Sequence, residues 1–154
     1  FNARSETLAT SRAFRHPFKS QRGIVPMSSF IEWRKEGSVK RPWLISGEDE
    51  ALAVAALWDV WEGAAQPLLS CTLVTTAAPA AFEPWHTRMP VLLAPGEFER
   101  WLDCAHPIDP GDPLFRSELK QTLRLQALDP AIGNSRNKAP ELLAGVGELI
   151  ELRA

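Results

Sequence analysis

The sequence is poor in cysteine, has no tyrosine and contains no long apolar run. Its 154 residues include only Cys71 and Cys104, too few for the disulfide framework of a small secreted domain. We therefore expect two inert, buried thiols in a reducing compartment. No stretch of 18 apolar residues is present, which excludes a transmembrane helix. Hydrophobic residues make up 45% and charged residues 23%, proportions that exclude collagen-like, coiled-coil and wholly disordered chains.

The common catalytic and cofactor signatures are also missing. The sequence has no Walker loop, no dinucleotide-binding glycine pattern, no H-E-x-x-H and no C-x-x-C. The three histidines, His16, His86 and His106, are scattered relative to the two cysteines, whereas a zinc site needs clustered ligands. We expect no metal and no cofactor.

Positive charge is concentrated in the first third of the chain. Residues 1–45 carry nine Lys or Arg and three Glu, a balance of +6, although the whole chain has a formal net charge of −2. Such asymmetry suggests a polyanion as partner for the basic part. The alternative is a solvated face that the acidic remainder balances in space.

The spacing of apolar residues and prolines predicts one α+β domain over residues 1–154. Strands are expected at 23–26, 43–45, 68–76 and 148–152. Residues 51–61 suit either a helix or a central strand. Two helices are expected, one opening at Pro95-Gly96-Glu97 and one at Asp112-Pro113. The apolar stripe of the second helix would consist of Leu114, Phe115, Leu119 and Leu123.

Three clusters of residues could carry chemistry, and each also has an ordinary structural interpretation. Residues 2–6 (N-A-R-S-E) could form a capped helix start, with Ser5 or Thr7 as the cap. In residues 30–33 (F-I-E-W), Glu32 lies between large apolar side chains, and burial would raise its pKa into a range suited to acid–base catalysis. It could equally face water on an edge strand. Residues 85–90 (W-H-T-R-M-P) could be a catalytic segment or a surface loop with a stacked Trp.

The same clusters, taken in order, resemble the SRAP family, the SOS-response-associated peptidases. The family pattern is N-A-R-x-E, a G-F-Y-E-W-like stretch, L-T-T-x-A and H-x-R-M-P. Here residues 2–6, 30–33, 75–78 and 86–90 correspond to these motifs. The resemblance runs from Asn2 to about Leu143. It implies a compact domain of short, mostly antiparallel strands with a barrel-like sheet core and a few peripheral helices.

The resemblance implies a function in DNA repair. Members of the family bind abasic sites in single-stranded DNA and form a covalent thiazolidine through an N-terminal cysteine. An α-amine has a pKa of about 7.7–8.0, so a neutral fraction can attack the sugar aldehyde near pH 7. No cysteine lies near position 1. We therefore expect an N-terminally incomplete domain whose crosslinking nucleophile is not in this chain.

The resemblance also assigns roles to particular residues. Asn2, Glu32 and His86 would be catalytic: Asn2 would hold the amine or a sugar hydroxyl, Glu32 would transfer protons, and His86 would help to open the sugar ring. Arg4, Thr75 and Arg88 would bind the DNA backbone, with Thr76 as an alternative to Thr75. Exposed Trp or Phe rings would stack on bases.

Two other functions stay open at this point. One is a thiol peptidase, for instance with a Cys71–His86 dyad, because such partners meet in space and not in sequence. The other is a non-catalytic remnant that binds single strands. The expected partner is single-stranded DNA with abasic sites, with no membrane, and the expected protein is a monomer that is cytoplasmic and nucleoid-associated.

Overall fold

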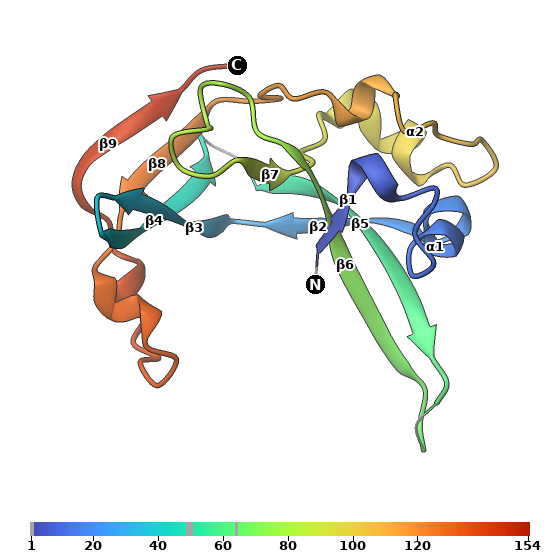
Figure 1. Cartoon of the computed structure of the whole chain (residues 1–154), viewed down its shortest axis with the longest axis horizontal. Helices are drawn as coiled ribbons and strands as arrows, with labels where there is room; N and C mark the ends of the chain where they lie inside the picture. The colour runs from blue at the N-terminus through green and yellow to red at the C-terminus, as the bar shows by residue number, and fades with distance from the viewer. Residues whose placement is uncertain (1, 49–50, 64) are drawn as a thin grey trace. The chain divides into compact units, whose positions relative to one another are not determined.

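The computed structural model of the protein describes residues 2–48, 51–63 and 65–154. The chain divides into two units, each built from three segments (Figure 1). The first unit comprises Phe1–Pro26, Ala53–Ala77 and Arg88–Ser117. The second comprises Met27–Leu52, Ala78–Thr87 and Glu118–Ala154.

The first unit is organised around a mixed sheet. In the described ranges the sheet has five strands: β1 (Asn2–Arg4), β2 (Arg22–Met27), β5 (Leu52–Trp61), β6 (Leu68–Ala77) and β7 (Arg88–Pro90). Their order is β1-β6-β5-β2, and β7 also pairs with β6. β1 runs parallel to β6, with Ala3 opposite Val74. β5 and β7 run antiparallel to β6. Ala3 and Val74 are fully buried, so the alternate residues of β1 and β6 lie on the other face of the sheet.

Three aromatic rings fill the core of the first unit. Phe18 comes from α1 (Arg15–Ser20) and Trp101 from α2 (Phe98–Leu102), which follows the 3-10 turn η2 (Pro95–Glu97). Phe115 lies in η3 (Pro113–Phe115). The ring centroids are 6.2–6.4 Å apart, with tilted or edge-on planes, the spacing at which aromatic pairs attract. Leu8, Leu57 and Leu114 are among the buried residues packed in the same cluster.

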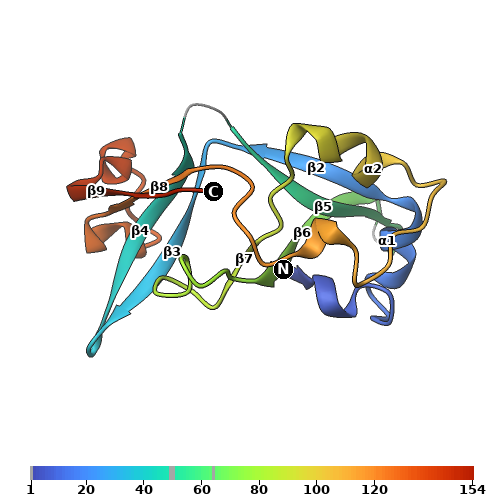
Figure 2. The same ribbon diagram turned by 90° about the horizontal axis from the view of Figure 1, so that it is seen from above.

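A buried arginine at the start of β2 connects the two helices of the first unit, α1 and α2. Figure 2 shows both helices near this end of β2. Arg22 is only 5% exposed. Its Nε donates to the Trp101 carbonyl at 2.6 Å and its Nη1 to the Phe18 carbonyl at 2.9 Å. Its Nη2 donates to the carbonyls of Asp103 and His106. Because these carbonyls lie at or beyond the carboxyl ends of α1 and α2, one guanidinium caps both helices.

The second unit has its own antiparallel sheet. Within the described residues its strand order is β3 (Ser29–Glu36), β4 (Val39–Gly47), β8 (Leu123–Ala127) and β9 (Val146–Leu152). Gly37 and Ser38 connect β3 to β4, and Gly37 has a φ of +64°, a conformation that favours glycine. β8 alternates buried leucines with outward polar residues. The sheet is open, with β3 at one edge and β9 at the other.

Apolar side chains are exposed at the end of β5 and at the start of β6. Figure 1 shows the two strands continuing as a ribbon, and residues 58–61 pair with 68–71. Trp61 is 57% exposed and Leu69 is 68% exposed. The ribbon therefore carries large apolar side chains that the rest of the first unit does not cover.

The expected strands are confirmed, and residues 52–61 are a strand. The α+β class, with short strands and few helices, is confirmed as well, although the strands form two open sheets and not one barrel. The helix expected after Asp112 is wrong. Asp112 does cap a turn, accepting from the Leu114 N–H at 3.0 Å, but the turn ends at Phe115. Leu123 instead begins β8, where Leu123, Leu125 and Ala127 are buried with a period of two.

Replacing Arg22 by Met should lower the free energy of unfolding by about 3 kcal/mol, because it leaves buried helix-end carbonyls without donors. Urea denaturation measures the change. The exposed Arg12 provides the control, and Arg12→Met should change stability by less than about 0.5 kcal/mol. Equal effects of the two substitutions would contradict the capping role.

Candidate active site

Glu32 and His86 lie together in the second unit. Glu32 is in the middle of β3, and His86 is near the end of the segment 78–87. The His86 Nδ1 is 3.9 Å from the Glu32 Oε1, and the two side chains are 47% and 22% exposed. This distance is too long for a direct hydrogen bond, but a small side-chain rotation would bring the imidazole and the carboxylate within the range of proton transfer.

Aromatic rings surround this pair, because the register of β3 and β4 places them there. Glu32 is opposite Trp43, and Phe30 is opposite Ile45, so these four side chains share one face of the strand pair. The segment 78–87 packs on that face. The Trp85 ring meets the Trp43 ring edge-on at 5.6 Å, and the Phe82 ring lies 6.3 Å from the Phe30 ring. Trp85 is thereby anchored next to His86.

Burial among these rings raises the pKa of Glu32 above its ordinary value of 4.5. The charge of His86 opposes the shift, as does the backbone N–H of Trp33, but burial is the larger effect. Desolvation of a carboxylate favours its neutral form. The expectation of a desolvated Glu32 is confirmed, although β3 is an edge strand of its sheet.

Asn2 and Arg4 lie in the first unit, on the face of β1 opposite to the buried Ala3. They pair with Leu73 and Thr75 of β6, and both side chains are exposed. In the described part of the chain, neither side chain makes a hydrogen bond or an ion pair. Arg4 therefore has its full set of N–H donors available.

Arg88 is engaged within the first unit. Its Nη1 and Nη2 donate to the two carboxylate oxygens of Glu6 at 2.8 and 2.9 Å. Its Nε donates to the Thr75 hydroxyl at 3.2 Å and its Nη2 to the Thr75 carbonyl at 2.7 Å. The hydrogen bonds from Arg88 lower the pKa of Glu6. A phosphate would have to compete with Glu6 for this guanidinium.

The threonine hydroxyls predicted to contact DNA are turned to the backbone. Thr75 is 9% exposed and its hydroxyl donates to the Ala3 carbonyl at 3.4 Å. Thr76 is 6% exposed and donates to the Phe115 carbonyl at 2.9 Å. Both hydroxyls tie elements of the first unit together.

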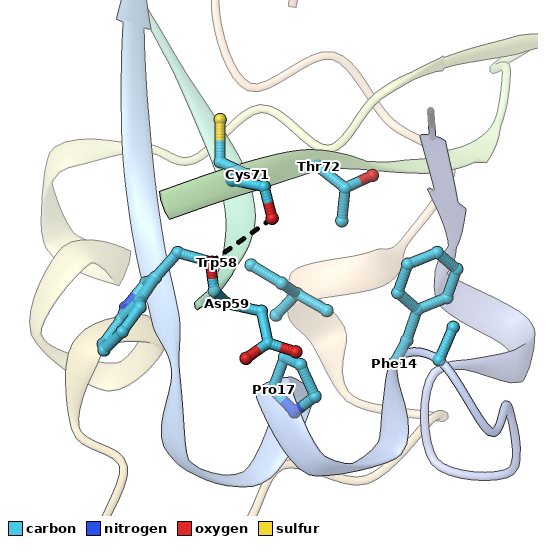
Figure 3. A pocket seen from close by; sticks show the side chains of 9 residues that line it. Phe14, Pro17, Trp58, Asp59, Cys71 and Thr72 are labelled. Carbon is cyan, nitrogen blue, oxygen red and sulfur yellow. Dashed lines mark hydrogen bonds between the residues drawn. The ribbon is translucent and has the colours of Figure 1, made fainter. Parts of the chain in front are cut away.

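The thiols are not buried, contrary to expectation. Cys71 is exposed and Cys104 is half-buried. Cys71 borders a cavity of about 180 Å³ in the first unit, and Figure 3 shows its thiol pointing away from the Asp59 carboxylate. The cavity is lined by Ala13, Phe14, Pro17, Leu57, Trp58, Asp59, Ser70, Cys71 and Thr72, with no histidine among them. Cys71 lies in the exposed part of β6. It pairs with Trp58 of β5, which is 40% exposed.

The described residues contain neither a cluster of metal ligands nor a membrane-spanning helix. No three His, Cys, Asp or Glu side chains there gather closely enough to hold a metal ion. No helix among them has the length and apolar character needed to cross a membrane.

A family model described as SOS response associated peptidase matches residues 1–135. The chain belongs to the SRAP family. Its resemblance to that family, expected from the order of the motifs, is thus confirmed. Within the family, Glu32 and His86 belong to the F-I-E-W and H-x-R-M-P motifs, and Asn2 and Arg4 belong to N-A-R-x-E.

Several SRAP relatives and structures are similar over most of this chain. Abasic site processing protein YoqW of Bacillus subtilis is 33% identical over 152 residues, covering 92% of this chain and 65% of the relative. Abasic site processing protein HMCES of Xenopus tropicalis is 27% identical, covering 94% of this chain and 50% of the relative. A crystal structure of a Bacteroides thetaiotaomicron protein superposes with a TM-score of 0.82 at 25% identity, covering 94% of this chain and 65% of that one. The chain thus spans half to two thirds of the length of these proteins.

Two interactions, one in each unit, are not evident from the sequence. Glu6 is the last residue of the N-A-R-x-E motif, and nothing local indicates its partner. Its bidentate contact with Arg88 spans 82 positions of sequence. In the sequence, Trp43 is recognisable only as part of a predicted strand. Its place opposite Glu32 follows from the register, which the length of the Gly37-Ser38 turn could have suggested.

Replacing Glu32 by Gln should stabilise the protein at neutral pH. Because the folded-state pKa is raised, the unfolded chain loses this proton at lower pH than the folded protein does. The wild type therefore loses stability relative to Glu32→Gln as pH rises from the ordinary glutamate pKa through the folded one. Thermal unfolding at pH 7 and at pH 3.5 measures the effect. The melting temperature of Glu32→Gln should exceed that of the wild type at pH 7, and the difference should shrink at pH 3.5. A constant difference would contradict the pKa shift.

Proposed function

We propose that this chain takes part in processing abasic sites in single-stranded DNA. The observation that carries the proposal is the Glu32–His86 pair, a desolvated carboxyl group 3.9 Å from an imidazole. Membership of the SRAP family supports it, as do relatives described as abasic site processing proteins.

The chemistry of an abasic site suits this pair. The sugar exists as a closed ring and as an open aldehyde, and its opening needs one proton removed from a hydroxyl and one delivered to the ring oxygen. A carboxyl group with a raised pKa exchanges protons closer to neutral pH than an ordinary one. His86 places a second group that can carry a proton, an imidazole, 3.9 Å from this carboxyl group.

The covalent step needs an N-terminal cysteine. Its amine condenses with the aldehyde to an imine and releases one water molecule. The thiol then adds to the imine carbon, its proton passes to the nitrogen, and a thiazolidine closes. Cys71 and Cys104 cannot perform this step, because a cysteine within the chain has no free α-amine. The adduct therefore requires a cysteine from outside residues 1–154.

A thiol peptidase is the weaker candidate. It would need a cysteine activated by a nearby base. The residues that line the cavity at Cys71 include no histidine, and the Cys71 thiol points away from Asp59 (Figure 3).

A denaturing gel tests the proposal. The protein, expressed from its native start codon, is mixed with a single-stranded oligonucleotide that carries one abasic site. A band that survives denaturation, and that disappears when the protein's α-amine is blocked, is the expected result. Glu32→Gln should slow formation of this band about 100-fold or more, the usual contribution of acid–base catalysis.

Glu36 provides the matched control for this substitution, because it lies on the same strand but is exposed. Glu36→Gln should leave the rate of band formation unchanged. Equal rates for Glu32→Gln and the wild type would remove Glu32 from the mechanism. The absence of any band from wild-type protein would reject the adduct as the product.

Arg4 should contact a phosphate of the strand. Arg4→Ala should weaken binding of single-stranded oligonucleotides regardless of base sequence, and the slope of log K against log salt should flatten by about 0.7. Fluorescence anisotropy over a range of salt concentrations measures this slope. Arg124, which pairs with Glu48 and Glu151, provides a control whose substitution by Ala should leave the slope unchanged. A loss confined to particular base sequences would contradict a phosphate contact.

A further inference from the structure

Arg34 is held in place by two tryptophan rings. It follows Glu32 by two residues on β3, so both side chains lie on the same face of the strand. The guanidinium carbon Cζ is 5.1 Å from the centroid of the Trp85 ring and 5.7 Å from that of the Trp43 ring. Both distances are within the range of a cation–π interaction. A guanidinium held over ring faces can still use N–H donors at its edge.

The charge of Arg34 is not neutralised by a carboxylate. Four charged side chains of β3 and β4 share this face: Glu32, Arg34, Glu36 and Arg41. Glu36 is 3.7 Å from Arg41, and Glu32 is 3.9 Å from His86. Arg34 lies directly opposite Arg41, an unfavourable arrangement of like charges. Across the ranges that the structure describes, Arg34 makes no hydrogen bond and no ion pair.

The two rings that hold Arg34 also carry unsatisfied donors. Trp43 is 6% exposed and Trp85 is 8% exposed. The indole Nε1 atoms of both are buried, and neither has an acceptor among the described residues. A buried N–H group without an acceptor is unfavourable. Arg34 and the two tryptophans that contact it thus each carry a donor group without a partner in the described part of the chain.

We propose that Arg34, held over the rings of Trp43 and Trp85, is a phosphate-binding residue next to the Glu32–His86 pair. A phosphate oxygen accepts hydrogen bonds from the edge of the guanidinium and supplies the missing counter-charge. The proposal deepens the proposed function and rests on it for the source of the phosphate, which is the backbone of a single strand. Arg88, whose guanidinium Glu6 already occupies, is less available for this role.

A titration with inorganic phosphate tests the site without any abasic DNA. The indole N–H resonances are followed by NMR and assigned with single Trp→Phe variants. Phosphate should shift the Trp43 and Trp85 resonances along a saturable curve, whereas chloride at equal ionic strength should not. Arg34→Gln should abolish the curve. Arg34→Lys keeps the charge but loses the planar fork, and should weaken phosphate binding. A curve that survives in Arg34→Gln would overturn the proposal.

A second measurement tests the strand as the source of the phosphate. Binding of an intact single-stranded oligonucleotide is measured against salt concentration for the wild type, Arg34→Gln and Lys35→Gln. Lys35 is the matched control, since it is the next residue and projects from the opposite face of β3. Arg34→Gln should flatten the salt slope by about 0.7, and Lys35→Gln should flatten it less.

The outcomes separate this site from the proposed function. A saturable phosphate curve with a slope change specific to Arg34 supports the site, even if no abasic adduct forms on the denaturing gel. A saturable curve without a slope change supports a site for free phosphate and excludes the strand. Equal slope changes in the two variants, with no phosphate curve, would reduce Arg34 to general surface charge and overturn the proposal. Far-ultraviolet circular dichroism confirms that each variant is folded.

Discussion

The pairing register of β3 and β4 is the constraint on which the candidate active site depends. A turn of two residues, with Gly37 in the left-handed region, places Glu36 opposite Val39 and thereby Glu32 opposite Trp43. Side chains alternate along a strand, so a shift of one residue would move every side chain of β3 to the other face. Glu32 would then lose its aromatic surroundings, and the raised pKa of its carboxyl would be lost with them. The chemistry of the second unit thus follows from the geometry of one turn.

The arginines show why a count of charges describes a binding surface poorly. Residues 1–45 contain nine basic residues, which alone suggest a continuous basic groove. In the structure these residues do different things: Arg22 is buried and caps two helices, Arg34 stacks on indoles, and Arg41 faces a carboxylate. The bidentate contact of Arg88 with Glu6 makes the same point for a residue outside that region. What distinguishes a cation free to bind phosphate is its lack of partners, and only the folded chain reveals this.

Strands and the desolvated glutamate could be predicted from the sequence because their signals are local. Alternation and β-branched residues marked β6, and the neighbours of Glu32 were apolar in the sequence itself. The helix predicted after Asp112 is wrong because it was also inferred from a local signal, the spacing of apolar residues. Leu114, Phe115, Leu119 and Leu123 have helical spacing, but the first two belong to a 3-10 turn and the last to a strand. The exposed position of Cys71 could not be predicted from the sequence. Alternation along β6 does not show how many of its residues the rest of the first unit packs against.

The ribbon of β5 and β6 has a consequence for the behaviour of this polypeptide at high concentration. In the described part of the chain, β1 meets β6 only at Leu73–Thr75, so residues 68–71 are paired on the β5 side alone. Their backbone N–H and C=O groups border exposed leucines, and the sequence from 52 to 87 contains no Lys or Arg to discourage contact between copies. An uncharged, apolar strand edge is a template for further strands. Residues 68–71 therefore offer an unpaired backbone edge to which a strand of a second copy can add.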